Sequence, residues 1–486
     1  MRRQPGFRRS NMRQVGLIVL AAMASIVAGA SLLVYASPLS PLFVGGAVAA
    51  IAIGIAWLRK PVLALYGAIF VALLPIGLIP DHVYSILNRA MLLVALGAWL
   101  LGLVARRRRI VWTSTALLML CFLVWGMIAL FWTPNLGLGM EKVVQYACRL
   151  ILFLLLVSNQ VGTKETLDGL MRTLALSGWV LVLAGMGTVL LQGYEPGTRL
   201  QILGTNMNQF GISALVTLPG VLWLAMQAPR GHKALRVFLS FVFILLALVL
   251  VAFSGSRGSA ISWLVTLLVF WFWRPTRLWG KLGLLILVLA AASAPFIFST
   301  VLERLVEGEG GTLGGRLAIW QAAWLLIRDH FWGGVGIGNA DYAVVPYVGT
   351  LGRTWGREWV AIHNPVLLIW AETGIPGILV YLGVLGSAVW LFVRRWRQHS
   401  RTGMRYLTSY FALVSSVSVG FMLSWIKGGG MEVHFTYFLM LALLLIPSHL
   451  DIKGLESKAE DSVKDTGKYA PRFKVLHPRR GAPGGE

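Results

Sequence analysis

The sequence contains little charge and few cysteines for its length. Charged residues make up 13% of its 486 residues and hydrophobic residues 57%, and the mean hydropathy is +0.74. These values lie far outside the range of soluble domains. The two cysteines, Cys121 and Cys148, have no spacing that indicates a metal site or a disulfide framework. A soluble globular fold and a disulfide scaffold are therefore excluded, and the chain is expected to lie in a membrane.

Several catalytic motifs are absent from the sequence. There is no Asp-x-Asp pair, so the usual ligands for a metal-held nucleotide sugar are missing. Neither the Gly-x-Ser-x-Gly turn nor the His-Glu-x-x-His helix of common hydrolases occurs. Residues 333–338 resemble a glycine-rich nucleotide loop, but no βαβ unit surrounds them. We therefore expect neither a metal nor a cofactor.

Long apolar runs make up most of the chain. Runs of roughly 17–22 residues recur between residues 15 and 446, long enough for helices to cross a hydrocarbon core, and no alternating strand pattern occurs. They predict an all-α polytopic protein of an inner or plasma membrane, with about 12–14 transmembrane helices. The first run has no evident cleavage site after it, so we expect a retained helix rather than a signal peptide.

The basic residues are distributed unevenly along the chain. Lysine and arginine number 43 against 19 acidic residues, which gives a formal net charge of +24. They collect in every second segment between apolar runs, at residues 59–60, 106–109, 230–236, 274–281 and 394–405 and in the tail. Because positive loops stay in the cytoplasm, both termini are predicted to be cytoplasmic. The charge thus indicates topology and attraction to anionic membrane lipid, not binding of nucleic acid.

One long polar segment, about residues 299–374, falls on the opposite, extracytoplasmic side. Its glycine-rich start is expected to be a flexible connector. From Arg316 to Asp329 the apolar residues follow helical spacing, which predicts an amphipathic helix against the membrane surface. Trp355 and Trp359, further along, are typical of the membrane interface. Since almost all other residues can be explained as membrane scaffold, chemistry is expected in this segment.

His363 is the first candidate for chemistry in the long segment. It is followed by Asn364 and Pro365, a capping side chain and a residue whose fixed φ suits a first helical turn. His363 is therefore predicted to lie at a helix N-terminus, where the positive end of the dipole keeps the imidazole neutral and available as a base. A lone histidine is more often structural, so its neighbours decide the interpretation.

Two arginines are predicted near helix ends on the same side. Arg257 lies in a Ser-Gly-Ser-Arg-Gly-Ser turn between apolar runs, and Arg199 precedes the polar residues 204–208, which end at Asn208. Together they form a plausible diphosphate clamp, although either guanidinium could also extend to lipid headgroups. Glu372 is the one carboxylate in the apolar segment after His363. It either orients a group in the site or hydrogen-bonds near a helix break.

The order of these motifs resembles the O-antigen ligase and Wzy polymerase superfamily. The resemblance covers about residues 237–391. The residues that carry it are Arg316-Leu317 with Trp320, Gly333-Gly334-Val335-Gly336-Ile337-Gly338-Asn339, His363-Asn364-Pro365 with Leu367, and Glu372-Thr373-Gly374-Ile375-Pro376-Gly377. The resemblance implies a GT-C-type glycosyltransferase that takes a glycan from an undecaprenyl-diphosphate carrier at the outer face, without metal or nucleotide and with inversion at the anomeric carbon.

The resemblance also implies roles for individual residues. His363 would accept the proton of the acceptor hydroxyl, and Arg257 and Arg199 would neutralise the diphosphate. Glu372, Arg316, Asn364 and Asn208 would support them. The sequence departs from the family where many relatives have Asp-Pro-Asn, because it has Asn206-Met207-Asn208. The implied organisation is a basic N-terminus at 1–14, transmembrane helices at 15–234, a ligase-like core at 235–395, further helices at 396–450 and a disordered basic tail at 451–486.

The acceptor remains open at this point. Lipid A core or a protein would make the chain a ligase of a bacterial inner membrane, and a growing polysaccharide would make it a Wzy-type polymerase. A transporter for lipid-linked glycans is an alternative of another class. It predicts paired broken helices in two matching halves, and the sequence has no internal repeat. A purely structural membrane subunit does not account for clustered arginine and histidine on the outer side.

Overall fold

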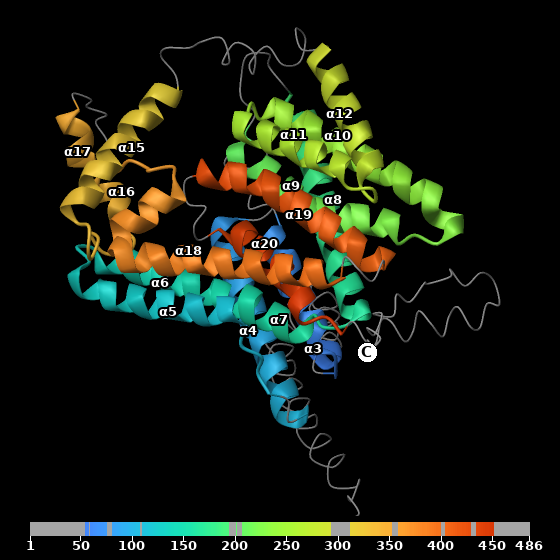
Figure 1. Ribbon diagram of the computed structural model, residues 1–486, viewed down its shortest axis with the longest axis horizontal. Helices are drawn as coiled ribbons and strands as arrows, with labels where there is room; N and C mark the ends of the chain where they lie inside the picture. Colours follow the sequence, from blue (N-terminus) through green and yellow to red (C-terminus); the bar gives the residue numbers. More distant parts are fainter. Residues whose placement is uncertain are drawn as a thin grey trace, which may run out of the picture.

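The structure is a computed structural model that describes residues 54–57, 59–74, 80–106, 109–193, 201, 207–292, 312–351, 358–399, 404–428 and 434–451. Every regular element in these ranges is a helix (Figure 1). Seven of the described helices are long and apolar enough to cross a membrane, and three shorter apolar helices accompany them. The predicted all-α polytopic fold is confirmed. The predicted number of spans stays a prediction, since the runs at 15–34 and 293–298 lie outside the described residues.

The helices follow the predicted apolar runs closely. In the first half they are α3 (Pro61–Leu73), α4 (Asp81–Arg106), α5 (Ser114–Ala129), η2 (Leu130–Trp132), α6 (Leu136–Arg149), the π-helix η3 (Leu150–Val157), α7 (Ser158–Gln160) and α8 (Lys164–Gln192). Next come α9 (Met207–Met226), η5 (Arg230–His232), α10 (Lys233–Phe253), α11 (Arg257–Phe272) and α12 (Arg277–Ala292). The last are α15 (Thr312–Asp329), α16 (Ala340–Ala343), α17 (Val345–Thr350), α18 (Pro365–His399), α19 (Arg405–Ile426), α20 (Phe435–Leu445) and η6 (Ile446–Ser448).

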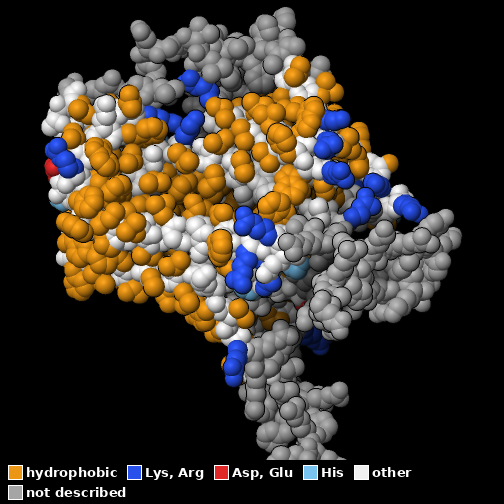
Figure 2. Space-filling view, viewed as in Figure 1, with side chains coloured by type: hydrophobic (Ala, Val, Ile, Leu, Met, Phe, Trp, Pro, Cys, Tyr) orange, Lys and Arg blue, Asp and Glu red, His pale blue; other side chains and the backbone are white. Residues whose placement is uncertain are grey.

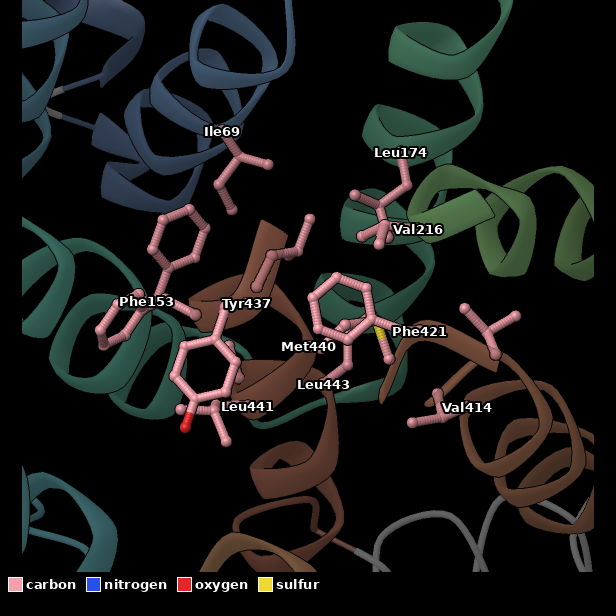
Figure 3. Close-up of a cluster of buried hydrophobic side chains, with 14 of the residues drawn as sticks. Ile69, Phe153, Leu174, Val216, Val414, Phe421, Tyr437, Met440, Leu441 and Leu443 are labelled. Atoms are coloured by element: carbon pink, nitrogen blue, oxygen red, sulfur yellow. The ribbon is translucent and has the colours of Figure 1, made fainter. Parts of the chain in front are cut away.

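The helix α20 lies at the centre of the bundle. All its residues from Thr436 to Leu445 are buried, so it is apolar on every side and must be enclosed by other helices. Figure 3 shows Tyr437 and Met440 of α20 among side chains from α3, η3, α8, α9 and α19. Lipid is as apolar as leucine, so close packing rather than exclusion from water holds such a core together. The outer surface of the bundle is also apolar, as the broad orange area of Figure 2 shows.

A small helical unit, here called the cap, covers the N-terminal end of α18. It consists of residues 312–351 and 358–364 and contains α15, α16 and α17, at the left of Figure 1. The cap has its own apolar core, which joins Ile319 and Leu326 of α15 to Val344, Val348 and residues of α18. The predicted helix at 316–329 is confirmed as part of α15, and its buried face packs on α17 and α18. The long polar segment is therefore a folded unit over its described part.

The end of the bundle opposite the cap is here called the basic end. It brings together helix ends that lie next to Lys- and Arg-rich segments in the sequence. The Trp223 indole at the end of α9 and the Tyr406 hydroxyl at the start of α19 both donate to Asp168 Oδ1, at 2.9 and 3.1 Å. Lys164 Nζ lies 5.4 Å from the Tyr406 ring centroid. Figure 2 shows Lys and Arg side chains gathered along the right-hand side, where α19 begins. Segments that the charge pattern assigns to one side of the membrane thus lie together.

Candidate functional site

The candidate site is positioned by a break in α18. Gly374 has φ 64° and ψ −170°, outside the helical region, and Pro376 has no N–H to donate to the carbonyl of Glu372. Residues 331–338, here called the strap, replace the lost helical hydrogen bonds. Val335 N donates to Ala371 O at 2.8 Å, Gly336 N to Glu372 O at 3.0 Å and Ile375 N to Phe331 O at 2.9 Å. The predicted helix break is therefore present, and the strap pairs its backbone N–H and C=O groups.

Glycine is required where the strap meets the break. Gly334 and Gly374 have φ of 68° and 64°, which side chains other than glycine rarely adopt. A Cβ on Gly334 would collide with the backbone of Glu372, and a Cβ on Gly374 with the backbone of Trp332. The glycines at 333–338, which do not form a nucleotide loop, therefore serve close backbone packing.

Side chains from α5 and the start of α6 fix the strap to the bundle. The indole of Trp132 donates to Gly333 O at 3.2 Å, and the indole of Trp125 donates to Thr373 O at 2.8 Å. Asn339, which is 4% exposed, accepts from the N–H of Asn135 at 3.1 Å. These contacts join segments more than two hundred residues apart in sequence. The cap is therefore anchored to the membrane helices through the segment between α15 and α16.

The backbone before His363 is fixed by two helices of the cap. The indole of Trp320, in α15, donates to Ile362 O at 2.9 Å, and the carboxylate of Asp341, in α16, accepts from Ile362 N at 3.0 Å. After His363, Asn364 Oδ1 accepts from the N–H groups of residues 366 and 367 at 3.0 and 3.2 Å. The predicted helix start at Asn364 and Pro365 is confirmed. The Asn364 side chain caps α18.

His363 itself has an unusual backbone. Its φ of 53° is the single positive value among the described residues other than glycine. This left-handed conformation is uncommon for histidine and costs on the order of 1–3 kcal/mol, which the surrounding hydrogen bonds must offset. Such conformations occur preferentially at functional sites. The strain directs attention to the same residue that the sequence motif selects.

Burial and positive charge lower the pKa of His363 and of Arg316. Burial lowers the pKa of His363 from 6.5, and the charge of Arg316 lowers it further. Burial likewise lowers the pKa of Arg316, and the charge of Arg257 adds to this effect. Charges influence one another in this way only at short range. Arg257 in α11, Arg316 in α15 and His363 are therefore linked one to the next by these electrostatic effects, and together we call them the cluster.

Arg257 begins α11 after a compact serine turn. Gly255 has φ 60°, and the Ser256 hydroxyl caps the helix by accepting from Ser259 N at 3.3 Å. Both serines are almost fully buried, at 2% and 1% exposure. Arg257 is therefore held at a helix N-terminus by a turn whose polar groups are already paired. The local sequence Ser-Gly-Ser-Arg-Gly-Ser thus fixes the backbone from which the Arg257 side chain extends.

Glu372 lies in a buried ion pair. Its Oε1 is 2.8 Å from Nζ of Lys142 in α6, and the two side chains are 2% and 13% exposed. Glu372 follows His363 by nine residues, which is about 13 Å along a helix. The geometry therefore favours the role near the helix break over direct action at the cluster. Sequence reasoning missed Lys142, because nothing local connects it with a residue 230 positions away.

The remaining predicted residues have different outcomes. Arg199 lies outside the described residues. Asn208 belongs to the first turn of α9, and its side chain lies outside the described part. The diphosphate role of the pair Arg199 and Arg257 is therefore untested. Instead, the structure brings Arg257 together with Arg316, which sequence reasoning named as supporting. Arg316 lies one helical turn before Trp320, whose indole donates to Ile362 O, just before His363.

Fold and site together define a polytopic membrane protein with a polar arginine and histidine site at one end of its helical bundle. Residues 241–382 match the sequence model of the O-antigen ligase family. The matched segment contains Arg257, the described part of the cap, His363 and the break in α18. Over this segment the chain is similar to the O-antigen ligase family. No curated protein matches the chain.

Proposed function

We propose that the protein is a glycosyltransferase of the bacterial inner membrane. It moves a glycan from an undecaprenyl-diphosphate carrier to an acceptor hydroxyl at the outer face, in the manner of an O-antigen ligase. The observation that supports this proposal is the cluster, in which burial and Arg316 lower the pKa of His363 and Arg257 acts on Arg316, all within the family-matched segment.

His363 serves as the base in the proposed reaction. The acceptor oxygen attacks the anomeric carbon and forms the new glycosidic bond, while the bond from that carbon to the diphosphate oxygen breaks, with inversion. The acceptor proton passes to the imidazole of His363. The lowered pKa keeps this imidazole neutral at neutral pH, so that its lone pair is available.

The arginines stabilise the leaving group. Undecaprenyl diphosphate gains negative charge as the glycosidic bond breaks, and guanidinium groups present paired N–H donors to phosphate oxygens. Burial lowers the pKa of Arg316, and repulsion by the positive charge of Arg257 lowers it further. A diphosphate between them relieves this repulsion. Arg257 and Arg316 carry this role, with Arg199 as a further contributor from the loop before α9.

One assay tests the proposal directly. Purified protein is given an undecaprenyl-diphosphate glycan with candidate acceptors, including lipid A core, in the presence of chelator. We expect the glycan on lipid A core and no loss of product with chelator. A longer glycan on the carrier would instead indicate a Wzy-type polymerase, and glycan crossing the membrane still attached to its carrier would indicate a transporter. A strict metal requirement would contradict both transferase assignments.

The arginine role is tested by substitution. Arg257→Ala is expected to lose most transfer while the protein is still made and purified as a monodisperse species, because the diphosphate charge is no longer neutralised. Removing one such donor typically lowers the rate about 10²–10³-fold. Arg328→Ala is the matched control, since that arginine is exposed at the end of α15. Near-normal product from Arg257→Ala would remove Arg257 from the site.

A further inference from the structure

A cavity with polar and apolar walls lies at the basic end of the bundle, away from the cluster. Its volume is about 420 Å³, and it is enclosed by the start of α5, the end of α18 and the residues after η6. Arg394, Arg395 and His449 contribute to its lining. His363 and Arg394 lie at opposite ends of α18. The cavity is therefore separate from the proposed transferase site.

The polar side of the cavity suits an anion. The guanidinium of Arg395 is held in place by hydrogen bonds to Ser448 O at 3.0 Å and to Gln398 Oε1 at 3.3 Å. Within the described residues, the buried Nε2 of His449 has no hydrogen-bond partner. A phosphate group can accept from guanidinium and imidazole N–H groups together. The cavity thus has a guanidinium held in place by hydrogen bonds and a histidine in its lining.

The apolar side of the cavity suits acyl chains. Trp112 at its mouth is 42% exposed, and tryptophan is typical of the boundary between headgroups and hydrocarbon. Beyond the cavity, α5 exposes Leu117 and Val124, and α18 exposes Val389 and Trp390. The two helices pack against each other. A molecule with an anionic head and apolar tails can therefore place both parts on this one surface.

We propose that this cavity binds the phosphate headgroup of an anionic phospholipid such as phosphatidylglycerol, with its acyl chains along α5 and α18. Basic pockets between membrane helices on the cytoplasmic side commonly hold anionic headgroups. The charge pattern places these helix ends on that side. The apolar surfaces beside the cavity favour a lipid over free phosphate. The proposal does not depend on the transferase activity.

The test uses the full-length protein in a non-ionic detergent, titrated with phosphatidylglycerol or phosphatidylcholine and read by native mass spectrometry. We expect preferential binding of phosphatidylglycerol. Each arginine near an anionic lipid contributes about fivefold in affinity, so Arg394→Gln should weaken binding about fivefold and Arg394→Gln with Arg395→Gln about twenty-fivefold. Arg394 makes no hydrogen bond within the described part of the chain, so its substitution should leave the fold intact.

The matched control is Arg274→Gln with Arg277→Gln, which removes two exposed charges between α11 and α12 outside the cavity lining. This control should bind phosphatidylglycerol within about twofold of the parent protein. An equal loss of affinity for phosphatidylglycerol in the control would show that general surface charge, and not the cavity, accounts for the binding. Equal binding of the two lipids, or unchanged binding by Arg394→Gln, would overturn the proposal. Thermal stabilisation by inorganic phosphate equal to that by phosphatidylglycerol would assign the cavity to free phosphate instead.

Discussion

His363 joins three properties at a single position. Its backbone is left-handed, its side chain is half-buried, and the charge of Arg316 acts on it. Each property alone has a structural explanation. Together they are difficult to explain by packing, because a smaller residue with a free φ would fill the turn at lower conformational cost. These three properties make the side chain of His363 the first one to test by substitution.

The first prediction separates the effect of the imidazole side chain from the effect of the strained backbone at His363. His363→Asn should fold normally, because asparagine tolerates positive φ well, yet it should lose about 10²–10⁴-fold in transfer rate for lack of a base. Transfer is measured on purified protein with a carrier-linked glycan, beside thermal stability in detergent. His363→Gly serves as a second variant that relieves the strain. Substantial transfer by both variants would exclude a basic role for His363.

The second prediction concerns pH. Only a neutral imidazole accepts a proton, so the rate should fall as the pH drops through the pKa of His363. Burial and Arg316 lower that pKa below 6.5, so activity should persist into more acidic solution than for an ordinary histidine. Arg316→Gln removes a positive charge, raises this pKa and should move the acid limb of the profile to higher pH. An unmoved limb, or one moved to lower pH, would contradict the electrostatic link.

At the scale of elements, the strap and the break in α18 depend on each other. A membrane helix with a glycine and a proline near one another leaves carbonyl groups without donors, which is costly away from water. The strap supplies those donors from a segment that the chain reaches before α18. The cap is thereby bonded to α18 by its backbone, and His363 is placed relative to the membrane helices.

A third prediction tests this joint. Gly374→Ala should destabilise the protein by roughly 1–3 kcal/mol or more, because the added Cβ meets the backbone of Trp332 at a positive φ. Gly386→Ala in the same helix is the control, since its Cβ would meet no atom within 4 Å. It should be neutral or stabilising by up to about 1 kcal/mol. Thermal midpoints in detergent give the comparison, and equal midpoints for the two variants would contradict the tight joint.

The fourth prediction concerns the ion pair between α6 and α18. Glu372→Gln should cost about 3–5 kcal/mol, because it leaves the Lys142 charge buried without its partner. Replacing both residues with apolar ones, as in Lys142→Met with Glu372→Leu, should restore much of the stability. Transfer per folded molecule should then recover as well. A stable double variant that transfers no glycan would show instead that Glu372 acts in the reaction.

At the scale of the whole molecule, the two ends of the bundle differ in kind. One end carries the cap and the cluster, and the other collects the basic helix ends with the cavity beside Arg394 and Arg395. This division fits a protein whose chemistry and whose positive charge lie on opposite sides of a membrane. The helices between them expose apolar side chains over a broad surface.

The fifth prediction tests that arrangement in cells. Single cysteines are placed at Arg328 near the cap and at Arg274 at the basic end, in a chain whose Cys121 and Cys148 are replaced. A membrane-impermeant maleimide on spheroplasts should label the first site and should label the second only after permeabilisation. The reverse pattern would place the cluster in the cytoplasm, where no lipid-linked glycan of the proposed kind is presented, and the proposed function would be wrong.

The sequence by itself determined the helical membrane fold, the ends of most described helices and the order of the motifs. These features follow from local periodicity and from charge at helix ends, which need no distant partner. The helix start at Asn364 and the break after Glu372 were predictable for the same reason. The family resemblance and the choice of His363 as a candidate also rested on short motifs, whose order along the chain can be read directly from the sequence.

The tertiary structure decided which residues meet. Arg257 and Arg316 are 59 positions apart and Lys142 and Glu372 are 230 apart, so no local pattern could pair them. The backbone just before the left-handed His363 is held by hydrogen bonds from Ile362 to Trp320 and Asp341, which lie in other helices. Local propensity is a property of neighbouring residues, whereas a charge cluster, a buried ion pair and a strained backbone each exist only where separate helices pack together.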